Sequence, residues 1–133
     1  MIYSHSISVA LPPERAMHLF TPVGERLWAS HWDPRFPAGE RGDGSAPGTV
    51  FLTGDTHWVV VDRAPGRVRY ARVTPGVRAG TVEVALRADG EATIADVTYD
   101  ITPLAGADDY DPAIHEWEPA IAAIAPDWRG GRA

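Results

Sequence analysis

The chain has 133 residues, which fits a single domain over 1–133 with one core and room for one ligand cavity. Its net charge of −6, with 12 arginines scattered among 18 acidic residues, disfavours nucleic acid as a partner. The absence of cysteine and lysine excludes disulfides, thiolate chemistry, Schiff bases and a phosphate-binding P-loop. The first residues contain neither a basic leader nor a long apolar run, so we expect no secretory signal, no membrane span and a cytoplasmic location.

Strand patterns dominate the first three quarters of the chain. Residues 2–10 alternate apolar side chains with serines, which predicts a strand with one face in water. Residues 11–20, LPPERAMHLF, predict a helix because prolines favour the first helical turn, and a second short helix is expected over 23–29 with Thr21 as its cap and Pro22 at its first position. Short turns separate five further strand-like runs, at 48–53, 57–62, 67–74, 80–87 and 92–102, and such turns are typical of antiparallel neighbours.

The end of the chain predicts a helix. Apolar side chains recur there at helical spacing, at Ile114, Trp117, Ile121 and Ile124. We expect this helix over 112–125, capped by Asp111, kinked at Pro119 and ended by Pro126, with its apolar side chains facing the concave side of the sheet. The Gly/Pro-rich stretch 38–48 predicts an exposed, mobile loop.

The order of elements and several local motifs resemble the START-like superfamily, also called SRPBCC. The motifs are LFTPVGERLW at 19–28, HWDPRFP at 31–37, GTVFLT at 48–53, VRY at 68–70, VTYDITPL at 97–104 and HEWEPAI at 115–121. The resemblance implies an α+β helix-grip fold, in which one curved antiparallel sheet of about six strands wraps around a long C-terminal helix, with two short helices after the first strand. A glycine is usual in this family where the present chain has His31. Members carry lipids or sterols, cyclise polyketides, sense hormones or activate a chaperone ATPase, so the fold alone does not give the function.

Two sets of residues are candidates for a cavity between the sheet and the C-terminal helix. The apolar set, which also has core packing as its alternative role, is Trp28, Trp32, Phe51, Trp58, Tyr70, Tyr99, Trp117 and Ile121. The polar set is His5, His31, Asp33, His57 and Arg72. Asp33 has an alternative role in fixing the turn before Pro34, and Arg72 has an alternative place in solvent at the rim of the sheet. No histidine pair has the spacing of metal ligands, so we expect neither a metal site nor a cofactor.

Three classes of function remain open. The sequence favours binding of a hydrophobic small molecule, lipid-like or polyketide-like, by a carrier or sensor, because the apolar wall is evident while no acid–base pair can be placed. The second class is an enzyme of the polyketide cyclase or dehydrase type that uses a pocket His, Asp or Tyr. The third is a protein-interaction module of the ATPase-activator kind. Whether the chain is an enzyme is therefore undecided, and both a monomer and a homodimer are compatible with it.

Overall fold

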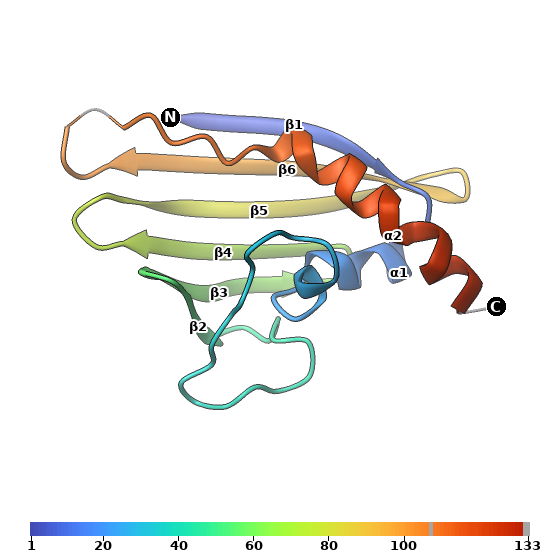
Figure 1. Cartoon of the computed structure of the whole chain (residues 1–133), viewed down its shortest axis with the longest axis horizontal. Coiled ribbons are helices and arrows are strands. Elements are labelled where there is room, and N and C mark those ends of the chain that lie inside the picture. The colour runs from blue at the N-terminus through green and yellow to red at the C-terminus, as the bar shows by residue number, and fades with distance from the viewer. Residues whose placement is uncertain (107, 132–133) are drawn as a thin grey trace.

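Six antiparallel strands form one sheet in the computed structural model, which describes residues 1–106 and 108–131, with side chains up to residue 124. The order across the sheet is β1-β6-β5-β4-β3-β2, so the first strand pairs with the last (Figure 1). The strands are β1 Ile2–Val9, β2 Val50–Thr53, β3 Thr56–Ala64, β4 Arg67–Thr74, β5 Arg78–Asp89 and β6 Ala92–Pro103. The predicted antiparallel sheet of about six strands is therefore confirmed.

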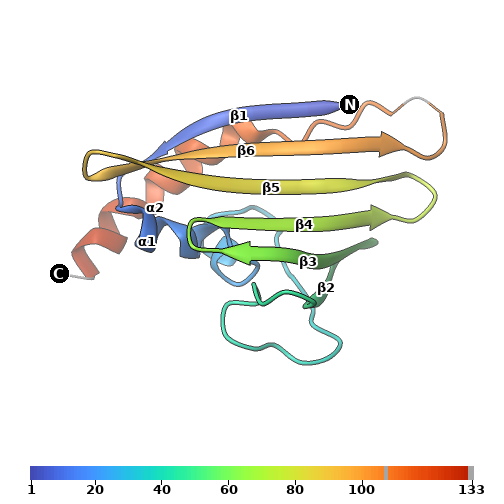
Figure 2. The ribbon, with the colours of Figure 1, turned by 180° about the vertical axis from the view of Figure 1, so that it is seen from behind.

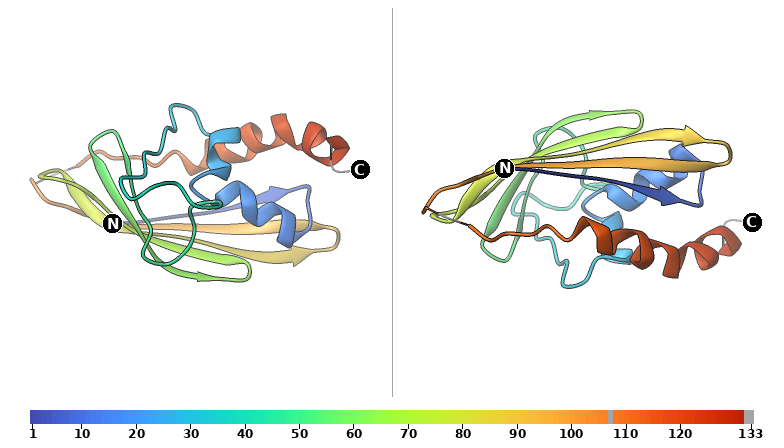
Figure 3. Two further views of the ribbon diagram at one scale, coloured as in Figure 1. Left: turned by 90° about the horizontal axis from the view of Figure 1, so that it is seen from below. Right: turned by 90° about the horizontal axis from the view of Figure 1, so that it is seen from above.

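Short helices and loops cover one face of this sheet. The helices are α1 Pro13–Ala16, α2 Trp117–Gly131 and the 3₁₀ helices η1 Met17–Phe20, η2 Gly24–Leu27 and η3 Ile114–Glu116. Figure 2 shows the sheet from behind with its other face uncovered, and Figure 3 shows edge-on that α1, α2 and the loop after η2 lie on the same side. No helix in the described ranges is long and apolar enough to cross a membrane.

The core lies between the covered face of the sheet and these helices. On β6, Val97, Tyr99 and Ile101 are buried while Asp100 between them is exposed, which is the two-residue period that the sequence predicts. Leu19 and Phe20 of η1 contribute almost fully buried side chains from the helical layer. Each such side chain stabilises the fold by about 1.5–3 kcal/mol relative to an exposed one.

A tight corner joins η1 to η2. The Thr21 hydroxyl donates a hydrogen bond to the His18 carbonyl (2.7 Å) and accepts one from the Gly24 amide (3.0 Å). A Cβ atom on Gly24 would lie 1.7 Å from the His18 carbonyl oxygen, so only glycine fits there. The predicted second helix is present as the shorter η2, but its N-cap is Val23 rather than Thr21, and Pro22 lies before it. The Thr21 hydroxyl instead closes the corner before η2, and this corner sets the direction in which Glu25 and Trp28 leave it.

The C-terminal helix differs from its prediction at both ends. Ala113 has left-handed backbone angles (φ 53°, ψ 40°), so a helix cannot start at Pro112, and the Asp111 carboxylate instead accepts the Ala113 amide in a turn (2.8 Å). Pro119 lies in the first turn of α2, where its missing N–H removes no helical bond, so the reason for the expected kink is absent. The prediction that Pro126 ends the helix is wrong, because α2 continues to Gly131. Ile114 and Ile121 are buried as expected, while Trp117 and Ile124 are only partly buried.

The loop over 38–48 is fastened at its middle. Most of it is exposed, as predicted, but Gly44 and Ser45 are buried. The Ser45 hydroxyl donates to the Asp43 carboxylate (2.6 Å) and accepts a bond from Arg63 of β3 (3.1 Å), and the Val23 amide donates to the Asp43 carbonyl (3.1 Å). These bonds tie the centre of the loop to the sheet and to the residue before η2.

Candidate functional site

A small cavity, here called the central cavity, lies between the covered face of the sheet and the helical layer. One carboxyl and a set of aromatic and aliphatic side chains line it: Glu25, Trp32, Phe51, Trp58, Tyr70, Val82, Val84, Tyr99 and Trp117. The space open to the centre of a water-sized sphere is about 20 Å³. That is room for about one water molecule, so the side chains of this region nearly fill it.

Hydrogen bonds fix three of the six aromatic side chains that line the central cavity. Phe51 stacks on Trp58, with ring centroids 5.6 Å apart, and Trp32 packs edge-on against both. The Trp32 indole N–H donates to the Pro22 carbonyl (2.8 Å), and the Trp58 indole N–H donates to the Thr53 hydroxyl (2.9 Å). The Tyr70 hydroxyl donates to the Phe20 carbonyl (2.9 Å). The polar atoms of these rings are therefore engaged, and their apolar surfaces face the cavity.

Two polar groups in the wall of the central cavity have no hydrogen-bond partner among the described residues, the Glu25 carboxyl and the Tyr99 hydroxyl. Glu25 as a whole residue is partly exposed, yet burial of its carboxyl raises its pKa well above the usual range. Burial also raises the pKa of Tyr99, and the neighbouring Tyr110 and Glu25 raise it further. Glu25 therefore keeps its proton to a higher pH than an ordinary glutamate, and it can hold or transfer a proton inside an aromatic cavity.

A second hollow, here called the Trp28–Trp117 groove, lies outside the central cavity. Its volume is about 280 Å³, and it is lined by Trp28, Ala29, Ser30, Pro112, Ala113, Glu116, Trp117 and Ala120. The Trp28 and Trp117 rings are 5.3 Å apart, and the Trp117 ring lies 6.2 Å from Tyr99 in the cavity wall. Because Trp117 lines both hollows, its ring is part of the boundary between them.

Backbone strain occurs beside this groove. Among the described residues, only His31 (φ 59°) and Ala113 (φ 53°) have positive φ without being glycine. Ala113 lines the groove, and His31 directly follows Ser30, which also lines it. Left-handed conformations at side chains other than glycine are costly and gather at functional sites. The left-handed angle at His31 also explains physically why a glycine is suited to this position.

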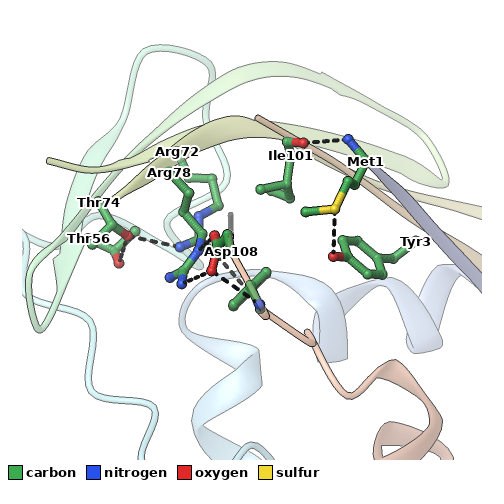
Figure 4. Close-up of polar contacts among 9 residues, drawn as sticks. Met1, Tyr3, Thr56, Arg72, Thr74, Arg78, Ile101 and Asp108 are labelled. Carbon is green, nitrogen blue, oxygen red and sulfur yellow. Dashed lines mark hydrogen bonds and ion pairs between the residues drawn. The ribbon is translucent and has the colours of Figure 1, made fainter. Parts of the chain in front are cut away.

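The far end of the covered face holds a buried guanidinium. Arg72 is 7% exposed and donates to the Tyr110 hydroxyl (2.8 Å) and to the Thr74 hydroxyl (3.0 Å), while its Nε has no partner among the described residues. Arg78 makes two bonds to Asp108 (2.6 and 2.9 Å), as Figure 4 shows. The guanidinium of Arg72 lies 5.1 Å from the centroids of both the Trp58 and the Tyr110 rings. These contacts fasten the segment after β6 to the end of the sheet.

The structure brings most of the predicted apolar residues together. Trp32, Phe51, Trp58, Tyr70, Tyr99 and Trp117 line the central cavity, Trp28 lines the Trp28–Trp117 groove, and Ile121 is buried without lining either. The predicted polar set does not gather there: His5, His31, Asp33 and His57 are exposed and line neither hollow, and Arg72 is buried rather than in solvent. Within the described ranges, no three His, Asp or Glu side chains are grouped in a way that could hold a metal ion.

The sequence reasoning missed Glu25. Charged residues on a short helix are usually solvated, and only one local signal points the other way. Glu25 lies three residues before Trp28, and in a 3₁₀ helix residues three apart lie on the same face. The inward direction of that face depends on the close approach of Gly24 to His18, which no sequence pattern predicts.

Comparisons with known proteins agree on the fold. No protein-family model and no curated protein sequence matches the chain. Among solved structures, it is similar to the Mll3558 protein from Rhizobium loti, with a TM-score of 0.66 and 20% identity over 96% of each chain. CalU16 from Micromonospora echinospora gives a TM-score of 0.65 and 18% identity over 97% of this chain and 74% of that one. PFC0360w, an HSP90 activator from Plasmodium falciparum, gives a TM-score of 0.61 and 14% identity over 98% of this chain and 96% of that one. With its six-stranded antiparallel sheet, short helices and C-terminal helix, the chain has the helix-grip fold that the resemblance implied.

Proposed function

We propose that the protein binds a small, largely apolar molecule at the central cavity and acts as its carrier or sensor. The observation that carries this proposal is the presence of two unpartnered polar groups, the Glu25 carboxyl and the Tyr99 hydroxyl, in the wall of an otherwise apolar cavity. Neither oxygen is sealed from solvent, so each is available to a polar group of a bound molecule. A bound molecule with one polar group facing Glu25 and Tyr99 pairs with both.

The size of the site sets a condition on binding. A cavity of about 20 Å³ accepts no organic molecule as it stands, whereas ligand sites commonly measure about 300–1,000 Å³. The Trp28–Trp117 groove, at about 280 Å³, supplies the missing room if the Trp117 ring rotates out of the boundary. Trp117 is only partly buried, and no hydrogen bond to another described residue holds its indole N–H. The polar end of the ligand then lies in the cavity and its apolar body lies in the groove.

The experiment uses a matched pair of variants on α2 and a neutral dye. Prodan, a naphthalene ketone whose emission shifts to the blue in apolar surroundings, is titrated into each protein. Ala120→Phe places a ring in the groove and is expected to weaken binding by at least about tenfold, or 1.4 kcal/mol. Ala123→Phe adds the same ring on an exposed part of α2 and leaves binding unchanged. Equal affinities for the two variants, or no binding by the wild type, contradict the proposal.

A second candidate function is proton transfer by Glu25, as in an enzyme of the cyclase type. It is favoured by the pKa of Glu25, which burial raises well above that of an ordinary glutamate, in the direction that suits a general acid or base. Opening of 5-nitrobenzisoxazole is a suitable assay, because a base removes one proton while the N–O bond breaks. A wild-type rate that rises through the pKa of Glu25 and disappears in Glu25→Gln supports this function. A Glu25→Gln rate equal to the rate of the exposed control Glu14→Gln rejects it.

A further inference from the structure

We infer that the ligand is an apolar amine, whose ammonium group is bound by the Glu25 carboxylate and the surrounding aromatic rings. This inference rests on the proposed function and names the class of ligand. Both hollows contain an acidic side chain, Glu25 in the central cavity and Glu116 in the Trp28–Trp117 groove. None of the described residues that line either hollow is an arginine or a histidine, although the chain has 12 arginines and 5 histidines.

The charges around the site therefore favour a cation over an anion. A carboxylate ligand would place its charge beside Glu25 in surroundings of low dielectric constant, where like charges repel strongly. His115 lies 3.9 Å from the Glu116 carboxylate but does not line the groove, so it does not neutralise the lining. Two arginines lie near the sheet side without lining the cavity: Arg63 acts on Tyr70, and Arg72 lies over the Trp58 ring, bonded to Tyr110 and Thr74.

The aromatic walls supply the second part of the recognition. The negative face of an indole or phenol ring attracts an ammonium group, and the attraction grows when water is excluded. Trp28 and Trp117 offer two such rings in the groove, and Trp32, Trp58 and Tyr99 offer further rings around the cavity that contains Glu25. An amine thus finds ring faces along its path and a carboxylate at the end, while its hydrocarbon part contacts the apolar groove.

The response to pH distinguishes an amine from a neutral ligand. An amine needs ionised Glu25, so its binding tightens as pH rises through the pKa of that carboxyl. A neutral hydrogen-bond acceptor needs protonated Glu25, so its binding weakens over the same rise in pH. The titratable groups that face Glu25 are Tyr70 from β4 and Tyr99 from β6, and burial raises the pKa of both, so both stay neutral over this range. Among the residues that line the central cavity, Glu25 is therefore the group whose charge changes.

The experiment compares three probes that share one phenylethyl body: 2-phenylethylamine, 2-phenylethanol and 3-phenylpropanoate. Affinities are measured by calorimetry at about pH 5 and about pH 8, where the ammonium group stays charged. At about pH 8 we expect the amine to bind at least about tenfold more tightly than the alcohol, with the propanoate weakest. The preference for the amine should shrink at about pH 5 and disappear in Glu25→Gln, while the control Glu14→Gln, exposed on α1, retains it.

Each outcome bears on a different statement. Equal affinities for the amine and the alcohol at the higher pH, or an amine preference that survives in Glu25→Gln, overturn the amine inference and leave apolar binding standing. Failure of all three probes and of Prodan to bind removes the proposed function, and the inference with it. If Glu25→Gln does not fold, the pH series on the wild type decides, because a preference that does not rise with pH contradicts a role for ionised Glu25.

Discussion

Replacing Glu25 by glutamine is expected to change how the stability of the fold depends on pH. Burial raises the pKa of Glu25 in the folded state above its value in the unfolded chain, which is about 4.3. Between these two values the folded state binds more protons than the unfolded state, so the free energy of unfolding falls as pH rises. The contribution is fully present below the unfolded pKa and is lost as pH rises through the raised folded pKa. The Glu25→Gln variant lacks this dependence because an amide does not titrate.

The size of the effect follows from the pKa difference. Each unit by which the folded pKa exceeds the unfolded pKa is worth about 1.4 kcal/mol of stability once pH lies above both values. The two arginine-paired carboxyls do not obscure this window: Arg87 lowers the pKa of Asp96 and Arg78 lowers that of Asp108, so these groups affect stability only below about pH 4. Tyr70 and Tyr99 have raised pKa values and titrate above the window.

Urea unfolding followed by tryptophan fluorescence, at several values between about pH 5 and about pH 9, measures the effect. We expect the wild type and the Glu14→Gln control to lose stability across this range, and Glu25→Gln to become the more stable protein at its upper end. Parallel curves for the wild type and Glu25→Gln would refute the reasoning, because they would show that water solvates the Glu25 carboxyl as it does an exposed one.

Two further predictions concern the left-handed backbone at His31 and the apolar side chains of the C-terminal helix. His31→Gly should stabilise the fold by about 0.5–1 kcal/mol, because glycine adopts φ 59° without strain. Urea unfolding checks this, with His31→Ala, which keeps Cβ, as the control. A less stable His31→Gly variant would reveal a stabilising contact of the imidazole. Ile121→Ala should cost about 2–5 kcal/mol, whereas Trp117→Ala should cost less than the ~3–5 kcal/mol of a fully buried tryptophan and should speed Prodan association in stopped-flow measurements. An unchanged association rate would place Trp117 outside the path of entry.

The strands and the aromatic wall could be predicted because each depends on a local period. Alternation along β6 alone puts Val97, Tyr99 and Ile101 on one face, and the same rule puts Tyr70 and Arg72 on one face of β4. Alternation does not predict whether another segment covers the end of β4 that carries Arg72. The segment after β6 brings Tyr110 and Asp108 over Arg72 and Arg78, and that irregular segment has no period from which its path could be read.

Local rules failed where tertiary contacts override them. Pro126 is a helix breaker by its chemistry, yet α2 passes through it, and Asp111 is a helix cap by its type, yet it closes a turn ahead of a left-handed Ala113. Glu25 is the case that matters for function. Its charge predicts solvent, and its inward position follows from the contact of Gly24 with the His18 carbonyl.

The two tryptophans that flank His31 show how one corner organises both hollows. The Trp28 indole N–H donates to the Leu19 carbonyl of η1 (2.7 Å), and the Trp32 indole N–H donates to the Pro22 carbonyl between η1 and η2 (2.8 Å), so both side chains are tied to this corner. One ring nevertheless lines the groove and the other lines the cavity, because the left-handed turn at His31 redirects the chain between them. Since Glu25 leaves the same corner, the carboxyl and both rings keep their relative positions only while the Gly24–His18 contact holds. The Gly/Pro-rich composition of the loop over 38–48 is therefore compatible with a rigid site, because the corner between η1 and η2, which precedes this loop, positions the site.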